Sequence, residues 1–122
     1  MTMTPIKANY KRGDIVLVLF PNSDLRTTKN RPALVVQAND LETGLSQMIV
    51  AMITSRMARS RHSSRVILQL TSSEGKQSGL LSDSVIMTDN LATIAFTEVN
   101  RRIGAIEMTK VNFALRYTLG LI

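Results

Sequence analysis

The chain has 122 residues, a length that favours a single domain with one hydrophobic core. Its 15 Lys and Arg residues against 9 Asp and Glu give a formal net charge of +6, which favours an anionic partner such as a nucleic acid. The chain has no cysteine and one histidine, which excludes a disulfide framework, a cysteine nucleophile and a metal site built from two histidines of one chain.

Signals for membrane insertion or secretion are lacking in the sequence pattern. No uninterrupted apolar run is longer than residues 15–20, far short of the roughly 20 residues that a membrane-spanning helix needs. Residues 1–14 carry lysines without the apolar segment of a secretory signal. We therefore expect a cytoplasmic protein.

The predicted elements begin with a flexible tail at residues 1–11, followed by one domain at residues 12–122. Residues 14–20, with the sequence DIVLVLF, are apolar without alternation, which is typical of a strand covered on both faces. Turn-forming residues predict loops at 21–30 and 38–46. Further strands are predicted at residues 33–37, 47–54, 66–70, 84–88, 91–96 and 103–107.

At the C-terminus the apolar residues change to helical spacing, which predicts a closing helix with Thr109 as its N-cap. The apolar side chains that share this spacing are Met108, Val111, Leu115, Leu119 and Ile122. Together these elements predict a mainly β (α+β) fold, a small and strongly bent partial barrel of about seven antiparallel strands with a C-terminal helix.

Charge is unevenly distributed, because no acidic residue occurs between Glu42 and Glu74. Within this stretch a basic segment follows the third predicted strand and contains Arg56, Arg59, Arg61, His62 and Arg65. Guanidinium groups match phosphate oxygens and release counterions from RNA or DNA, so one interpretation is a phosphate-binding loop. The other is an ordinary solvated loop in which His62 is exposed and incidental.

Two more polar residues stand at the ends of predicted strands. Arg31 precedes Pro32, a position that favours extended backbone, and is either a functional group at the mouth of a strand or a surface charge. Thr54 ends an otherwise apolar strand, where a threonine commonly bonds a neighbouring backbone group. Asp83 and Asp89 flank a later strand, and two carboxylates give only weak support to a metal-dependent nuclease site.

Several segments carry a resemblance that covers nearly the whole chain. They are RGDIVLVLFPNSDL at residues 12–25, NRPALVVQ at 30–37, VAMITS at 50–55, GLLSDSV at 79–85, RRIGAIE at 101–107 and LRYTLGLI at 115–122. In this order and at this spacing, they resemble the PemK/MazF-like family, the toxins of bacterial toxin–antitoxin pairs.

The resemblance implies an SH3-like barrel with a C-terminal helix, assembled as a homodimer. It implies a sequence-specific endoribonuclease that cleaves single-stranded mRNA without a metal or other cofactor and is neutralised by an acidic segment of a cognate antitoxin. The family's catalytic arginine and threonine map onto Arg31 and Thr54, and a loop that covers the site maps onto residues 21–30. The residues expected to contact RNA are Asp24, Arg26, Lys29, Ser55, Arg56, Arg59, Arg61, His62, Arg65 and Asp89.

The expected chemistry is attack of the RNA 2′-OH on the adjacent phosphorus, so the substrate carries its own nucleophile. Arg31 suits stabilisation of charge on the phosphorane better than proton donation, because its pKa is above about 12. Thr54 would bond a phosphate oxygen or position the 2′-OH.

One position departs from the family pattern. Many relatives carry an arginine two residues before an acid in the fifth strand, where this chain has Met87 before Asp89. Two alternatives therefore stay open: a non-catalytic RNA- or protein-binding module, and a gyrase-poison type of toxin, which the absence of tryptophan disfavours.

Overall fold

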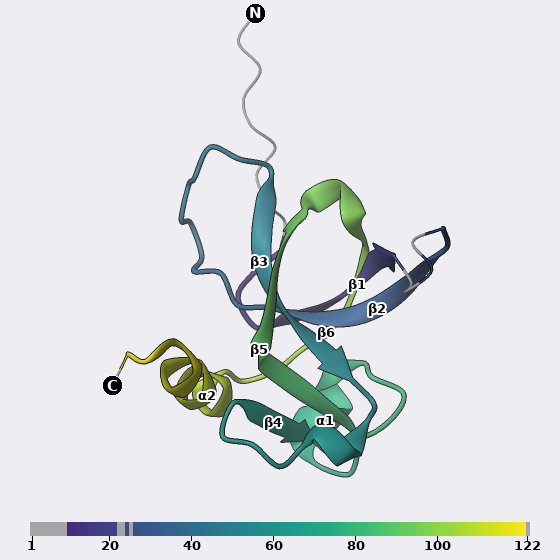
Figure 1. Ribbon diagram of the computed structural model, residues 1–122, viewed down its shortest axis with the longest axis vertical. Helices are drawn as coiled ribbons and strands as arrows, with labels where there is room; N and C mark the ends of the chain where they lie inside the picture. Colours follow the sequence, from purple (N-terminus) through teal and green to yellow (C-terminus); the bar gives the residue numbers. More distant parts are fainter. Residues whose placement is uncertain (1–9, 22–23, 25, 122) are drawn as a thin grey trace, which may run out of the picture.

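The computed structural model describes residues 10–21, 24 and 26–121 (Figure 1). The elements in chain order are β1 (Asp14–Pro21), β2 (Thr28–Val35), β3 (Gln47–Thr54), η1 (Met57–Arg59), β4 (Arg65–Leu68), α1 (Ser73–Ser78), β5 (Ser84–Ala95), η2 (Phe96–Glu98), β6 (Val99–Ala105) and α2 (Thr109–Leu119). The strands form one six-stranded antiparallel sheet in the order β4-β5-β3-β2-β1-β6.

The predicted strands at 84–88 and 91–96 are the two halves of a single strand, β5. Along β3 the pairing passes from Ala51 opposite Leu91 to Met52 opposite Met87, so residues 88–90 of β5 have no partner in β3. Such a bulge bends a strand and increases its twist. Figure 1 shows the result, a long β5 that joins a lower part of the sheet beside β4 to an upper part beside β3. The sheet therefore has six strands where about seven were expected.

The other boundaries differ more modestly from the prediction. β3 lies at residues 47–54 as expected, and the expected 21–30 loop is shorter because β2 begins at Thr28, paired with Pro21 of β1. The ordered domain begins no later than Tyr10, which packs on the core, while Lys11 donates its backbone N–H to Asp14 at 2.8 Å. Residues 1–9 of the expected tail lie outside the described residues.

β1 is buried on both faces around Ile15, Val16 and Val18, as its apolar sequence predicts, but Leu19 toward its end is 41% exposed. Ile15 belongs to one core cluster and Val16 and Val18 to another, because successive side chains of a strand point to opposite faces. The first cluster is covered by α2 through Val111 and Ala114. Register errors are therefore strongly disfavoured, since a slip of one residue would exchange two buried faces.

The start of α2 differs from the expected capping. Met108 is the N-cap residue and makes no side-chain hydrogen bond to the helix. Glu107 accepts hydrogen bonds from the backbone N–H of Thr109, at 2.9 Å, and from the Thr109 hydroxyl. The hydroxyl bond is the main reason why the pKa of Glu107 lies below its usual value. Thr109 is therefore the first helical residue, and the glutamate before it satisfies its N–H.

α1 lies between the strands predicted at residues 66–70 and 84–88, in a segment where the sequence pattern predicts no helix. The Ser72 hydroxyl caps this short helix by accepting from the N–H of Gly75 at 3.0 Å, and the helix ends at Gly79 with φ +74. A Cβ on Gly79 would lie 2.0 Å from the backbone oxygen of Ile103, so glycine is required there by close packing against β6. In the part of the chain that the structure describes, no helix is long and apolar enough to cross a membrane.

Candidate nucleic-acid interface

The two predicted catalytic residues come from neighbouring strands of the sheet. The β2–β3 pairing ends with Ala33 opposite Met52, because Pro32 has no N–H with which to extend the ladder of hydrogen bonds. Continued by two residues, the same register brings Arg31 opposite Thr54. Arg31 is also paired with Val18 of β1, and Thr54 with Val85 of β5.

Both residues lie on one face of the sheet. Alternation along β2 places Arg31 with Ala33, and alternation along β3 places Thr54 with Met52, and both apolar partners belong to the same core cluster. Arg31 is exposed and Thr54 is half-buried. The polar pair thus stands at the edge of an apolar face, where a substrate can reach it.

The Thr54 hydroxyl oxygen accepts the backbone N–H of Arg56 at 3.2 Å. The expected local hydrogen bond of a strand-end threonine is therefore present. Since the oxygen accepts, the hydroxyl proton stays available to a second acceptor. Thr54 can hold the start of the basic segment and still donate to a phosphate oxygen.

The basic segment forms a surface loop around η1. Ser55, Arg56, Arg59 and Arg61 are exposed. Two backbone hydrogen bonds of 3.0 Å hold the turn. The N–H of Arg59 donates to the backbone oxygen of Arg56, and the N–H of Ser60 donates to that of Met57. Three arginine side chains therefore stand on the loop that follows Thr54 directly.

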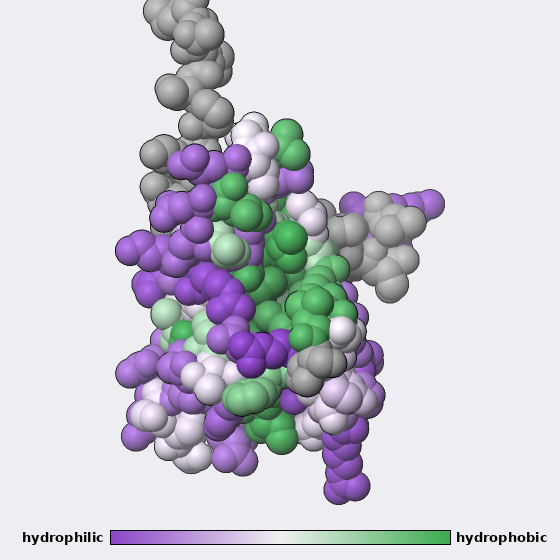
Figure 2. All heavy atoms as spheres, turned by 90° about the vertical axis from the view of Figure 1, so that its left-hand side faces the viewer, coloured by the Kyte–Doolittle hydropathy of each residue, from purple (hydrophilic) through white to green (hydrophobic). Residues whose placement is uncertain are grey.

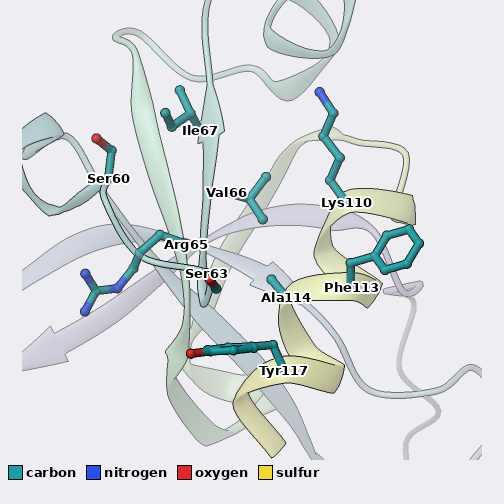
Figure 3. A pocket seen from close by; sticks show the side chains of 9 residues that line it. All are labelled: Ser60, Ser63, Arg65, Val66, Ile67, Lys110, Phe113, Ala114 and Tyr117. Atoms are coloured by element: carbon teal, nitrogen blue, oxygen red, sulfur yellow. The ribbon is translucent and has the colours of Figure 1, made fainter. Parts of the chain in front are cut away.

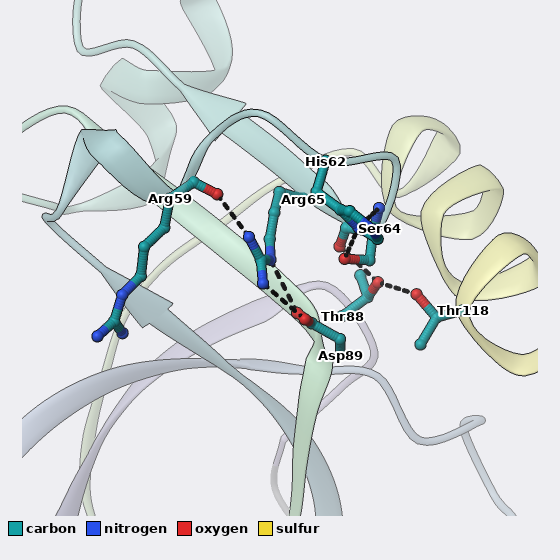
Figure 4. Close-up of polar contacts among 7 residues, drawn as sticks. All are labelled: Arg59, His62, Ser64, Arg65, Thr88, Asp89 and Thr118. Carbon is teal, nitrogen blue, oxygen red and sulfur yellow. Dashed lines mark hydrogen bonds and ion pairs between the residues drawn. The ribbon is translucent and has the colours of Figure 1, made fainter.

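Arg65 differs from these three because it is paired (Figure 4). Its Nε and Nη2 donate to the two carboxylate oxygens of Asp89 at 3.0 and 2.7 Å, and its Nη1 donates to the backbone oxygen of Arg59 at 2.9 Å. Hydrogen bonds from Arg65 hold the pKa of Asp89 below its usual value, and those bonds also raise the pKa of Arg65. Both groups are charged at neutral pH and largely offset each other's charge.

His62 is exposed and turned toward its own loop. Its Nδ1 accepts the backbone N–H of Ser64 at 3.1 Å and lies 2.7 Å from the Ser64 hydroxyl oxygen. Because an N–H donates to it, Nδ1 carries no proton in this arrangement. The ring also meets Tyr117 edge to face, with 5.9 Å between centroids. These contacts fit the incidental interpretation of His62 better than a general base.

A buried hydroxyl network fixes the end of the loop to the bulge of β5. The backbone oxygen of Ser64 accepts two hydrogen bonds from Thr88, one from its backbone N–H at 3.0 Å and one from its hydroxyl at 2.6 Å. Thr88 Oγ1 also lies 2.8 Å from Thr118 Oγ1 (Figure 4). Thr88 is fully buried. The residue next to it, Asp89, is thereby held at the surface of the bulge beside Arg65.

The covering loop is shaped by Asp24. Its carboxylate accepts the backbone N–H groups of Arg26 at 2.9 Å and of Thr27 at 3.1 Å, and the N–H of Arg26 is the main reason why the pKa of Asp24 is lowered. Arg26 is exposed, and Lys29 lies in β2 opposite Phe20. Asp24 therefore folds its own loop, while the two cations can face a ligand. Residues 22, 23 and 25 of this loop lie outside the described residues.

An open groove of about 570 Å³ lies between β4 and α2 (Figure 3). It is lined by Ser60, Ser63, Arg65, Val66, Ile67, Lys110, Phe113, Ala114 and Tyr117. Phe113 and Tyr117 are 61% and 56% exposed, although the whole chain has only 3 Phe and 2 Tyr residues. Sequence reasoning missed both, and their signal was an aromatic pair four residues apart, off the apolar stripe of the helix.

Part of the apolar stripe predicted at the C-terminus packs against the chain's own core. Val111 is fully buried and Leu115 packs against the same core cluster, so these residues stabilise the chain's own fold. Leu119 is exposed, and Ile122 lies outside the described residues. Figure 2 shows apolar side chains gathered in a band on the side of the molecule where α2 lies.

Comparison with known sequences identifies the family. Residues 11–119 match the sequence profile described as "PemK-like, MazF-like toxin of type II toxin-antitoxin system". The chain belongs to this family. Membership agrees with the segments that carry the resemblance, and it confirms the sequence-based assignment.

Solved structures share the fold. The chain is 23% identical to an endoribonuclease in complex with its cognate antitoxin from a mycobacterial species, with a TM-score of 0.70 over 93% of this chain and 97% of that one. It is 24% identical to the Mycobacterium tuberculosis toxin MazF-mt6, with a TM-score of 0.63 over 88% and 93%. For MazE-MazF from Deinococcus radiodurans the identity is 18% and the TM-score 0.68, over 95% and 100%. The mainly β α+β fold with a C-terminal helix is thus a MazF-like fold.

Proposed function

We propose that this protein is a sequence-specific, metal-independent endoribonuclease toxin that cleaves single-stranded mRNA by 2′-OH attack. The observation that carries the proposal is the placement of Arg31 and Thr54 on adjacent strands and one face, at the start of an exposed basic loop. Family membership supports it, as does the endoribonuclease activity stated for the mycobacterial protein that shares the fold.

The cleavage step needs little covalent chemistry from the protein. The 2′-oxygen of one nucleotide attacks the adjacent phosphorus and loses its proton, the bond to the 5′-oxygen breaks, and that oxygen takes up a proton. The products are a 2′,3′-cyclic phosphate and a 5′-OH. Arg31 stabilises the charge on the phosphorane oxygens, and the Thr54 hydroxyl donates a hydrogen bond to one of them or positions the 2′-OH.

The exposed arginines of the basic loop hold the RNA strand next to Arg31 and Thr54. Arg56, Arg59 and Arg61 bind phosphates, and Arg26 and Lys29 approach from the covering loop. The rest of the expected contact set is Asp24, which acts through the shape of its loop, with Ser55, His62, Arg65 and Asp89. RNA affinity should fall as salt rises, because the binding groups are exposed cations.

The same cations attract an antitoxin. We propose that a cognate antitoxin supplies an acidic, partly disordered segment that competes with RNA for the basic loop. The mycobacterial relative was solved with its cognate antitoxin, and the Deinococcus structure contains MazE with MazF. Because mRNA is the target, we place this activity in the cytoplasm.

We further propose a homodimer that forms through the groove between β4 and α2. Each copy presents two features at this groove: the exposed side chains of Phe113 and Tyr117, and the outer edge of β4, which is the terminal strand of the described sheet. In a symmetric dimer, both features would meet their counterparts in the second copy. Two copies related by a two-fold axis would then bring their basic loops together around a single RNA strand.

The deciding experiment incubates the purified protein with a mixed RNA pool in EDTA and sequences the 5′-OH ends. We expect cleavage after a short common sequence, and no cleavage when the 2′-OH at that position is replaced by hydrogen. RNA binding without cleavage would favour the alternative of a non-catalytic binding module, in which Met87 replaces the arginine of the family pattern. Cleavage of the deoxy substrate would refute 2′-OH attack.

A further inference from the structure

Arg65 lies beside the position where the family pattern places an arginine on β5. Its partner across the β4–β5 ladder is Met87, and Met87 in turn pairs with Met52 of β3. The row of Val66, Ile86 and Ile53 comes next, and the row after it contains Ile67, Val85 and Thr54. Arg65 thus stands on the same face as Thr54, two residues along and two strands across, so the two are not direct cross-strand neighbours.

The guanidinium of Arg65 connects two parts of the chain through three hydrogen bonds. Two of them reach the carboxylate of Asp89, in the bulge of β5, and the third reaches the backbone oxygen of Arg59, in the basic loop. Figure 4 shows the Arg65 guanidinium between these two partners. The side chains of Arg65 and Asp89 are only 21% and 34% exposed, so the pair is partly shielded from water.

We propose that Arg65 and Asp89 form a positioning pair that fixes the basic loop relative to Thr54. The inference rests on the proposed function, since it assigns the pair to cleavage. The loop is then held at two points: the N–H of Arg56 donates to Thr54 at its start, and Arg65 bonds the backbone oxygen of Arg59 further along. The guanidinium of Arg65 on β4 thus reaches Asp89 on the neighbouring strand β5. Met87 of β5 lies directly opposite Arg65.

The opposite interpretation is that Arg65 binds an RNA phosphate directly and Asp89 merely obstructs it. The two interpretations predict effects of opposite sign for Asp89→Asn. Removing the carboxylate raises the net charge by one, so an obstructing aspartate would, once removed, give tighter binding and faster cleavage. A positioning aspartate, once removed, leaves binding as strong or stronger while kcat falls, because the loop loses its fixed place.

The experiment compares Asp89→Asn and Arg65→Lys with the wild-type protein, and Glu98→Gln is the matched control. Glu98 is exposed on η2, so its substitution makes the same charge change without touching the basic loop. Lysine keeps the charge of Arg65 but cannot reach both carboxylate oxygens and a carbonyl in one geometry. Single-turnover cleavage, RNA affinity and hydrogen exchange at the amides of residues 59, 60 and 62 are measured for each folded variant.

We expect both variants of the pair to lower kcat by about 10- to 100-fold with KM little changed, since a misplacement of about 1 Å can cost about 100-fold. The amides of residues 59, 60 and 62 should exchange faster in both, and Glu98→Gln should match the wild type in rate and exchange. Cleavage by Asp89→Asn at or above the wild-type rate would overturn the inference, as would unchanged exchange in both variants. If the wild-type protein cuts no RNA, the proposed function fails, and the exchange measurement alone then decides whether the pair holds the loop.

Discussion

Replacing Arg31 by alanine tests the proposed site most directly. Arg31 is exposed in β2, opposite Val18, and belongs to neither core cluster. Surface substitutions of this kind usually change the free energy of unfolding by no more than about 0.5 kcal/mol. The variant should therefore fold and melt close to the wild type, and any loss of activity should reflect the chemistry.

The expected loss is large because Arg31 is the cation placed opposite Thr54. Removing one preorganised donor from a developing oxyanion typically costs about 2.7–4 kcal/mol, which corresponds to about 100- to 1,000-fold in rate. RNA affinity should fall much less, since Arg56, Arg59 and Arg61 remain on the basic loop. The loss should thus appear in kcat more than in KM.

The assay is single-turnover cleavage of an oligonucleotide that contains the preferred sequence, with thermal unfolding measured in parallel. Arg101→Ala provides the control, since Arg101 is exposed on β6, two strands from β2, and its loss makes the same charge change. A folded Arg31→Ala variant that cleaves at the wild-type rate would remove Arg31 from the site. Equal losses in the two variants would mean that only total charge matters.

Three further predictions concern other parts of the molecule. Thr54→Val should lower the cleavage rate by about 10- to 100-fold with RNA binding largely kept, because a hydrogen bond to a charged group contributes about 1.5–3 kcal/mol; unchanged kinetics would exclude the hydroxyl. Phe113→Asp should convert a dimer into a monomer by light scattering at micromolar concentration, and a wild-type monomer would refute the dimer proposal. Glu107→Gln should lower the melting temperature at pH 7, because hydrogen bonds from Thr109 lower the pKa of this carboxyl in the folded state. The difference from the wild type should be constant above the usual pKa of a glutamate and close as the pH falls through the lowered pKa; a pH-independent difference would contradict this reasoning.

The sequence predicts best what depends on local apolar pattern. Residues 48–53 are all apolar, and with Gln47 and Thr54 at the ends they form β3 with the expected bounds. Residues 14–20 lie in β1, whose apolar residues do not alternate with polar ones, and both faces of the strand are buried from Ile15 to Val18, although Leu19 is exposed. Helical spacing likewise places α2, and only its cap differs, since Glu107 was not weighed as an acceptor.

The features that sequence reasoning missed depend on contacts between distant residues. The strands predicted at residues 84–88 and 91–96 leave out Asp89 and Asn90, but these two residues belong to the bulge through which β5 continues. The pairing of Arg65 with Asp89 spans 24 positions of sequence and requires β4 and β5 to be adjacent. Neither residue type nor spacing distinguishes this paired arginine from the exposed ones on the same loop.

The placement of the proposed catalytic pair follows from burial elsewhere in the sheet. Arg31 and Thr54 share a face only if β2 and β3 keep the register in which Ala33 lies opposite Met52. A slip of one residue would move Arg31 relative to Thr54 onto the other face, and it would also exchange Leu34 with residues of the second core cluster. Because Ala33, Leu34 and Val35 of β2 and residues 50–53 of β3 are buried, such a slip is costly at each of these positions. Arg31 in the exposed half of β2 and Thr54 at the end of β3 are therefore positioned by the register of the buried parts of the same two strands.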